Sequence, residues 1–102
     1  MILNRQNQDI KNKADEAADF LKGLANPHRL NILCQLVEGE KNVTELITAT
    51  NLPQTSVSQH LAKLRKEGII DYRRDHRSLY YSISHDAVLK IMMILYESFC
   101  NK

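Results

Sequence analysis

Residues 54–68, QTSVSQHLAKLRKEG, constrain the fold more than any other stretch, because they form a helix with very little apolar surface. Val57, Leu61 and Leu64 recur at helical spacing and fall on one narrow stripe when residues are placed at about 100° each. Three anchors can dock a helix on a core, but they leave its other side to face something else. Gly68 is expected to end this helix.

A shorter helix is predicted immediately before it. Residues 43–50, VTELITAT, carry apolar side chains on one side, and Asn42 and Glu45 have the spacing of a capping box. Residues 51–53, Asn-Leu-Pro, separate the two helices, since a residue before proline is driven out of the helical region. Two helices joined by a three-residue turn are typical of a helix-turn-helix unit.

After this unit the period of the apolar pattern changes from 3.6 residues to 2. Residues 70–72 and 79–83 alternate apolar and polar side chains, which predicts the two strands of a β-hairpin. Residues 73–78, RRDHRS, lie between them and are expected to form a charged hairpin tip.

Two helices are predicted upstream, over about residues 9–23 and 26–39, and one downstream, over about residues 85–100. The last helix is apolar almost all the way round, and a terminal helix in a chain of 102 residues cannot bury every side alone. A second copy of the chain is therefore expected to cover it, the alternative being a central helix in the core of one chain. The sequence predicts a mainly α (α+β), dimeric winged helix-turn-helix with about five helices and one β-hairpin wing, as a single domain over residues 1–102.

The positive charge is concentrated in the predicted helix-turn-helix and hairpin. The whole chain has a net charge of +2, and residues 1–50 hold six basic and seven acidic side chains, a net of −1. Residues 51–80 hold six basic and three acidic side chains, a net of +3. A local basic region of this kind favours a polyanionic partner.

Other features exclude several classes of protein. No apolar run approaches the roughly 20 residues of a membrane span, and residues 1–11, MILNRQNQDIK, have no stretch long enough for a signal peptide. We therefore expect a cytoplasmic protein with no membrane partner, in which Cys34 and Cys100 are kept reduced. No enzyme is indicated, because the chain has no Gly-rich phosphate loop and no nucleophile with an evident base partner.

The polar side of the helix over residues 54–68 suits double-stranded DNA. Hydroxyls and amides let a helix approach the floor of the major groove, whereas Lys and Arg suit phosphates and the minor groove. A dimer would place two such helices in successive major grooves, so an inverted-repeat operator is expected. The alternatives are a solvated face or a protein partner, and His60, beside the apolar stripe, suits packing as well as a base contact. The predicted DNA-binding residues are Gln54, Thr55, Ser56, Ser58, Gln59, His60, Lys63, Arg73, Arg74 and Arg77.

The segments LKGLANPHRLNIL, VTELITATNLPQTSVSQHLAKLRKEGII and DHRSLYYSIS resemble the ArsR/SmtB family of dimeric winged-helix repressors. The resemblance covers about residues 18–100 and implies repression relieved by an inducer, with the first and last helices forming the dimer interface. Four residues match positions that face DNA bases in the family: Gln54, Thr55, Ser58 and Gln59. Pro53 departs from the Ser often found before this helix, which changes the cap but not the face.

Many members of this family sense metals, so the resemblance implies two ligand sets to compare. The first needs cysteines near Glu45, as in an ELCVC-type motif, but this chain has TELITAT, without a thiolate. The second needs carboxylate and imidazole pairs on the last helix, where His85 and Asp86 are adjacent and only Glu97 follows. We expect no metal site and no cofactor.

The two cysteines are 66 positions apart, and on spacing alone both are small buried apolar residues. The resemblance extends to a branch of the family that responds to persulfides and other reactive sulfur species, with one Cys in the second helix and one near the end of the last. It implies that Cys34 and Cys100 are the thiol sensor and that the inducer is a persulfide or polysulfide. Thiols too far apart for an unstrained direct disulfide would explain selectivity against peroxide. A response to peroxide or metal ions, and an anti-repressor role, are the alternatives.

Overall fold

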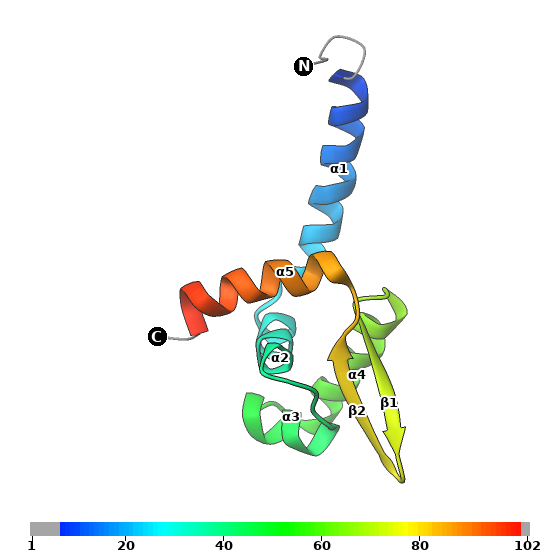
Figure 1. The fold of residues 1–102 in the computed structure, drawn as a ribbon, viewed down its shortest axis with the longest axis vertical. Coiled ribbons are helices and arrows are strands. Elements are labelled where there is room, and N and C mark those ends of the chain that lie inside the picture. The colour runs from blue at the N-terminus through cyan, green and yellow to red at the C-terminus, as the bar shows by residue number, and fades with distance from the viewer. Residues whose placement is uncertain (1–6, 101–102) are drawn as a thin grey trace.

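The computed structural model describes residues 7–100, which form five α-helices, one π-helical turn and one two-stranded antiparallel sheet (Figure 1). Residues 1–6, part of the segment predicted to lack a signal peptide, and residues 101–102, the end of the predicted domain, lie outside the described residues. The elements are α1 (Asn7–Leu24), α2 (Pro27–Val37), α3 (Val43–Thr50), α4 (Gln54–Lys66), β1 (Ile70–Asp75), β2 (Ser78–Ile83), α5 (Asp86–Leu95) and the π-helical turn η1 (Tyr96–Cys100). This order confirms the predicted winged helix-turn-helix.

The core of the molecule is aliphatic, and α4 contributes to it through its three predicted anchors. Val57 and Leu64 are fully buried, and Leu61 is 1% exposed. They belong to one cluster with side chains from the end of α1, from α2 and α3, from β1 and the residue before it, and from α5: Leu24, Ile32, Leu33, Leu36, Leu46, Ile69, Ile70, Val88 and Met92. The polar side of α4 is therefore turned away from the core.

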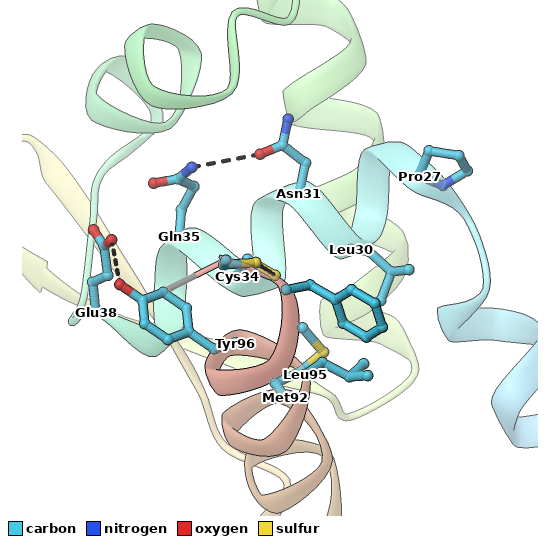
Figure 2. A pocket seen from close by; sticks show the side chains of 11 residues that line it. Pro27, Leu30, Asn31, Cys34, Gln35, Glu38, Met92, Leu95 and Tyr96 are labelled. Atoms are coloured by element: carbon cyan, nitrogen blue, oxygen red, sulfur yellow. Dashed lines mark hydrogen bonds between the residues drawn. The ribbon is translucent and has the colours of Figure 1, made fainter. Parts of the chain in front are cut away.

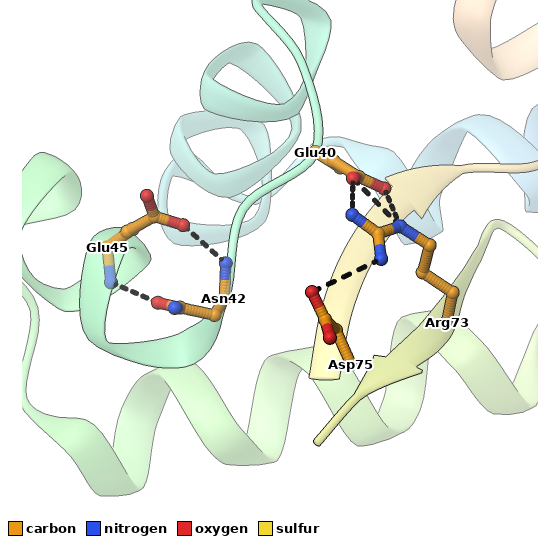
Figure 3. A network of polar contacts seen from close by, with 5 residues as sticks. All are labelled: Glu40, Asn42, Glu45, Arg73 and Asp75. Carbon is orange, nitrogen blue, oxygen red and sulfur yellow. Dashed lines mark hydrogen bonds and ion pairs between the residues drawn. The ribbon is translucent and has the colours of Figure 1, made fainter. Parts of the chain in front are cut away.

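Local hydrogen bonds set the limits of the helix-turn-helix. Asn42 and Glu45 form the predicted capping box, in which each side chain accepts a hydrogen bond from the backbone N–H of the other residue, at 2.8 and 2.9 Å (Figure 3). Asn51 ends α3 in the left-handed conformation, with φ of 60°, which asparagine tolerates. Pro53 precedes α4 without a side-chain capping bond, as its position in the sequence predicts.

The wing is longer and its tip shorter than predicted. The two strands stay paired up to Asp75 and Ser78, so the turn spans only the residues between them, where His76 has a left-handed φ of 57°. The prediction that all of residues 73–78 form the tip is wrong. Arg73 and Arg74 lie in β1, because the two strands remain paired up to the tight turn that connects them.

The last predicted helix is divided into two elements. α5 ends at Leu95, and the chain continues to Cys100 as a wider π-helical turn. Val88 and Met92 bury one side of α5 in the core. Among residues 7–100, no helix combines the length and the apolar character that crossing a bilayer requires.

Two apolar faces lack cover within this chain. α1 projects away from the body of the molecule (Figure 1), and its residues Ile10 and Leu21 are 56% and 48% exposed. On α5, Met93 and Ile94 are 51% and 66% exposed. Exposed aliphatic side chains gathered on two helices are typical of an interface rather than of a free surface.

Candidate DNA-binding face and thiol site

The side of α4 opposite its anchors is polar and open. Ser56 is half-buried at the flank of this face. The other predicted contacts on it are exposed: Gln54, Thr55, Ser58, Gln59 and Lys63. Thr55, Gln59 and Lys63 succeed one another every four residues and so form one row along the helix. This row can enter a groove without any rearrangement of the core.

His60 takes a different place from the other predicted contacts on α4. Its ring is half-buried and lies 5.9 Å from the ring of His28, centroid to centroid. Burial lowers the pKa of His60, and the nearby charge of Arg29 lowers it further. A neutral, partly covered imidazole is suited to packing α4 against α2 rather than to binding a phosphate.

The end of α4 is fixed to the wing by one arginine. The Nε of Arg65 donates a hydrogen bond to the Oδ1 of Asp71 at 3.2 Å, and its guanidinium lies 4.2 Å from the ring centroid of Tyr72. The hydrogen bonds from Tyr72 N–H and Arg65 hold the pKa of Asp71 below its usual range. Helix and hairpin therefore share one ion pair close to the predicted DNA-binding surface.

The three predicted wing arginines divide into two kinds. Arg73 donates from Nε to both carboxylate oxygens of Glu40, at 2.9 and 3.0 Å, and Nη2 also binds Glu40 (Figure 3). Its Nη1 lies 3.9 Å from a carboxylate oxygen of Asp75. Arg74 and Arg77 are exposed, and neither forms an ion pair with another described residue. Arg73 is thus neutralised within the protein, whereas the other two remain open to phosphate.

A second connection joins the wing to the loop after α2. The N–H of Lys41 donates to the carbonyl of Tyr81 at 3.1 Å, and the N–H of Tyr81 donates to the carbonyl of Lys41 at 2.8 Å. The loop residue therefore pairs with β2 as a third, one-residue strand. Together with the Glu40–Arg73 pair, it fixes the wing to the end of α2.

The two cysteines, far apart in the sequence, meet in space. Their sulfurs are 3.2 Å apart, with Cys34 half-buried on α2 and Cys100 exposed on η1, and both are free thiols. Burial, together with the neighbouring Cys100 thiol, raises the pKa of Cys34 to about 12. At this separation a direct disulfide needs only a small approach of the two sulfurs. The idea that distance alone excludes peroxide is therefore not supported.

Both thiols open onto a pocket of about 440 Å³ between α2 and the α5–η1 segment (Figure 2). Its walls combine apolar side chains, such as Leu30 and Leu95, with the amides of Asn31 and Gln35. A pocket of this size admits a small molecule, so access to the thiols does not require local unfolding.

One hydrogen bond connects the thiol site with the loop that contacts the wing. The hydroxyl of Tyr96, one turn before Cys100, donates to a carboxylate oxygen of Glu38 at 2.9 Å (Figure 2). Glu38 ends α2 and also lies 3.7 Å from the ammonium of Lys41. The hydrogen bond raises the pKa of Tyr96. Contacts therefore run without interruption from η1 through the loop to β2.

Glu38, Glu40 and Tyr96 were not among the predicted functional residues. Their partners lie 58 or 33 positions away, and no spacing rule connects such residues before the fold is known. The nearest signal in the sequence is that these two glutamates flank Gly39, just after α2. Within the described residues, no three His, Cys, Asp or Glu side chains lie close enough together to hold a metal ion.

This chain is a winged helix-turn-helix in which α4, the second helix of that unit, presents an exposed polar row beside a wing with arginines that are unpaired among the described residues. These features define a class of DNA-binding transcriptional regulators. Residues 26–72 match the family model described as "Bacterial regulatory protein, arsR family". The transcriptional activator HlyU of Vibrio cholerae is 34% identical over 93 residues, which cover 91% of this chain and 86% of that protein. The chain belongs to the arsR family, whose members are regulators and not enzymes.

Solved structures agree with this assignment. The crystal structure of the transcriptional repressor BigR from Xylella fastidiosa is similar with a TM-score of 0.86 and 36% identity, covering 93% of this chain and 94% of that one. The solution structure of a homodimeric winged helix-turn-helix DNA-binding domain from Mycobacterium bovis, a possible ArsR-family regulator, has a TM-score of 0.71 and 29% identity. It covers 94% of this chain and 86% of that one.

Proposed function

We propose that this chain is a homodimeric, cytoplasmic repressor that binds an inverted-repeat operator and leaves it when Cys34 and Cys100 react with a persulfide or polysulfide. The observation that carries the proposal is the 3.2 Å separation of two free thiols, held by different elements and open to a pocket. A cysteine thiolate attacks a sulfur of the donor and expels the donor's thiolate, and the second cysteine then attacks the new persulfide, which closes a bridge of two or more sulfurs and releases hydrosulfide.

The DNA-binding surface is formed by the α4 row and the open wing arginines. Thr55 and Gln59 are assigned to base edges, with Gln54 and Ser58 beside them, because their side chains are exposed and short enough for the major groove. Lys63, Arg74 and Arg77 are assigned to phosphates. Ser56 and His60 then act at the flank, and Arg73 positions the wing instead of binding DNA.

A dimer supplies the second recognition helix. The exposed apolar side chains of α1 and α5 support an interface formed by the first and last helices, and the Mycobacterium bovis relative is described as homodimeric. In such a dimer the two copies of α4 would lie about one helical turn of DNA apart. Any rotation of α5 changes that spacing.

Two routes connect the thiols to DNA in this proposal. A bridge between α2 and η1 pulls on α5 and hence on the dimer interface. The same pull displaces Tyr96 from Glu38 and so disturbs the loop that holds the wing. A bridge that lowers DNA affinity about 100-fold needs a difference of about 2.7 kcal/mol between the two states, within the range of ordinary coupling energies.

The test is a gel-shift titration of DNA selected from a random duplex library, with reduced, persulfide-treated and peroxide-treated protein. We expect tight binding by reduced protein, loss of binding after persulfide, and recovery after a reductant. Cys34→Ser is expected to bind DNA but not to respond. An unchanged mass after persulfide treatment, or normal release of DNA by Cys34→Ser, would contradict the switch. Displacement of another DNA-bound protein without a loss of affinity would indicate an anti-repressor.

A peroxide response is the second candidate, and one observation favours it. Sulfurs 3.2 Å apart can close a direct disulfide once one of them is oxidised to a sulfenic acid. The raised pKa of Cys34 slows attack by that thiol on a peroxide and on a persulfide alike, so it does not distinguish the two inducers. The peroxide arm of the gel shift distinguishes the two inducers.

A further inference from the structure

The pocket beside the thiols is lined mainly by apolar side chains. Leu30 and Leu95 line it from α2 and α5, and Phe99 stands at its edge with 75% of its surface exposed. Among the described residues that line the pocket, Glu38 is the single charged one at neutral pH, and Lys, Arg and His are absent. The lining therefore offers an anionic molecule no cationic partner, and the carboxylate of Glu38 is already paired with the ammonium of Lys41, 3.7 Å away, and with the hydroxyl of Tyr96.

This pocket is distinct from the apolar face assigned to the dimer. Met92, Leu95 and Phe99 follow one another at intervals of three and four residues and face α2 across the pocket. Met93 and Ile94 do not line it and are exposed. The α5–η1 segment thus carries two apolar faces, of which one is beside the thiols.

We propose that the inducer is an organic persulfide, R–S–SH, whose R group is uncharged and apolar and sits on Leu30, Leu95 and Phe99. This inference rests on the proposed thiol switch and adds the class of donor. An apolar R group gains from leaving water, whereas a carboxylate on R would lose hydration in the pocket without gaining a cationic partner from its lining. The pocket volume of about 440 Å³ accommodates an R group of the size of a benzyl ester.

The reaction balances with the persulfide as oxidant. The Cys100 thiolate attacks the outer sulfur of R–S–SH, the donor's S–S bond breaks, and R–S⁻ leaves and takes up a proton. Cys100 then bears the persulfide Cys–S–SH. The Cys34 thiolate attacks the inner sulfur, which forms the bridge and releases HS⁻. If Cys34 has also become a persulfide, the same closure gives a trisulfide bridge and again releases HS⁻.

Three donors with the same reacting sulfurs test this selectivity. They are the persulfides of N-acetylcysteine, of its methyl ester and of its benzyl ester, which differ in charge and then in apolar area. The rate of sulfur addition to the native reduced protein is followed by intact-protein mass, and a short cysteine peptide gives the intrinsic ratio of the donors. We expect the methyl ester to react about threefold to tenfold faster than the acid, relative to the peptide. The benzyl ester should gain about a further tenfold.

Two variants assign the preference to the pocket. Phe99→Ala removes an exposed ring without touching the core and should reduce the advantage of the benzyl ester. Glu38→Gln should accelerate the acid while leaving the methyl ester nearly unchanged. Glu97→Gln, an exposed carboxylate on η1 outside the pocket, is the matched control and should change neither ratio.

The outcomes separate the two proposals. Donor ratios equal to those of the peptide, or ratios unaltered by Phe99→Ala and Glu38→Gln, overturn the inference about the donor and leave the thiol switch intact. Native protein that gains sulfur from none of the donors overturns both. Sulfur addition with the expected ratios but with DNA still bound supports the donor class and contradicts the switch.

Discussion

Replacing Arg77 by alanine is expected to weaken the salt dependence of DNA binding, whereas replacing Arg73 is not. Both arginines belong to the wing, yet the carboxylates of Glu40 and Asp75 already form ion pairs with Arg73. An arginine that reaches a phosphate releases a counterion, and one that stays in an internal ion pair does not. The two variants therefore differ in the slope of affinity against salt and not merely in affinity.

The magnitude follows from the number of open arginines. Each phosphate contact contributes about 0.9 to the slope of log affinity against log salt on duplex DNA, and a dimer carries two copies of Arg77, so the slope should fall by about 1.8. Between about 50 and 200 mM salt the variant should lose about 12-fold less affinity than the parent protein does. Arg73→Ala should lower affinity by a similar factor at every salt concentration, because the wing loses its hold on the loop.

Fluorescence anisotropy with a labelled operator, repeated at five or six salt concentrations, measures these slopes. Lys11→Ala, a change of equal charge on exposed α1, is the control and should leave the slope unchanged. Glu40→Gln should steepen the slope by freeing Arg73. Equal reductions of slope in Arg73→Ala and Arg77→Ala would refute the division of the wing arginines into two kinds.

Three further predictions concern the core, the half-buried thiol of Cys34 and the hydrogen bond between Tyr96 and Glu38. Leu64→Ala should lower the free energy of unfolding by about 2–5 kcal/mol in urea titrations, because Leu64 is fully buried. Lys66→Ala, at an exposed position on the same turn of α4, should lower it by less than about 0.5 kcal/mol, and equal effects would contradict the anchor role. Because the pKa of Cys34 rises from 9.0 to about 12 on folding, the folded protein holds that proton more tightly, and stability should be constant below about pH 9 and fall as pH rises toward 12. Melting temperatures of the reduced protein from pH 8 to 10.5 check this, and Cys34→Ser should flatten the fall. Tyr96→Phe removes the hydrogen bond to Glu38 but leaves both thiols, so sulfur addition should proceed normally. The loss of DNA affinity that follows sulfur addition should become at least about threefold smaller, a change of about 0.65 kcal/mol. Full release of DNA by this variant would exclude the Tyr96–Glu38 contact from the coupling.

Much of the fold could be predicted from the sequence, because the patterns that determine it involve residues close together in the chain. The capping box at Asn42 and the spacing of Val57, Leu61 and Leu64 act within one or two turns, and each occurs where it was predicted. The change of period after α4 likewise identified both strands. Local patterns suffice wherever neighbouring residues alone decide the conformation.

The partners of charged side chains could not be predicted in this way. Arg73 was predicted to contact DNA because the sequence placed it in the charged hairpin tip, and its pairing with Glu40, 33 positions earlier, could not be read from the sequence. The family resemblance implied that Cys34 and Cys100 act together as one sensor, whereas the 3.2 Å contact of their sulfurs depends on how η1 packs against α2. Such distances are set by tertiary packing, and no fixed spacing in the sequence predicts them.

The measurement that tests the central claim most directly compares the operator binding of Gln59→Ala with that of the parent protein on the full inverted repeat and on singly substituted repeats. We predict two chains per site and a loss of about 1–3 kcal/mol per base contact on the selected operator. We also predict loss of discrimination at one base pair in each half-site, with non-specific affinity unchanged. Binding by Gln59→Ala and Thr55→Ala with the affinity and sequence preference of the parent protein would contradict the assignment of the α4 polar row to the major groove.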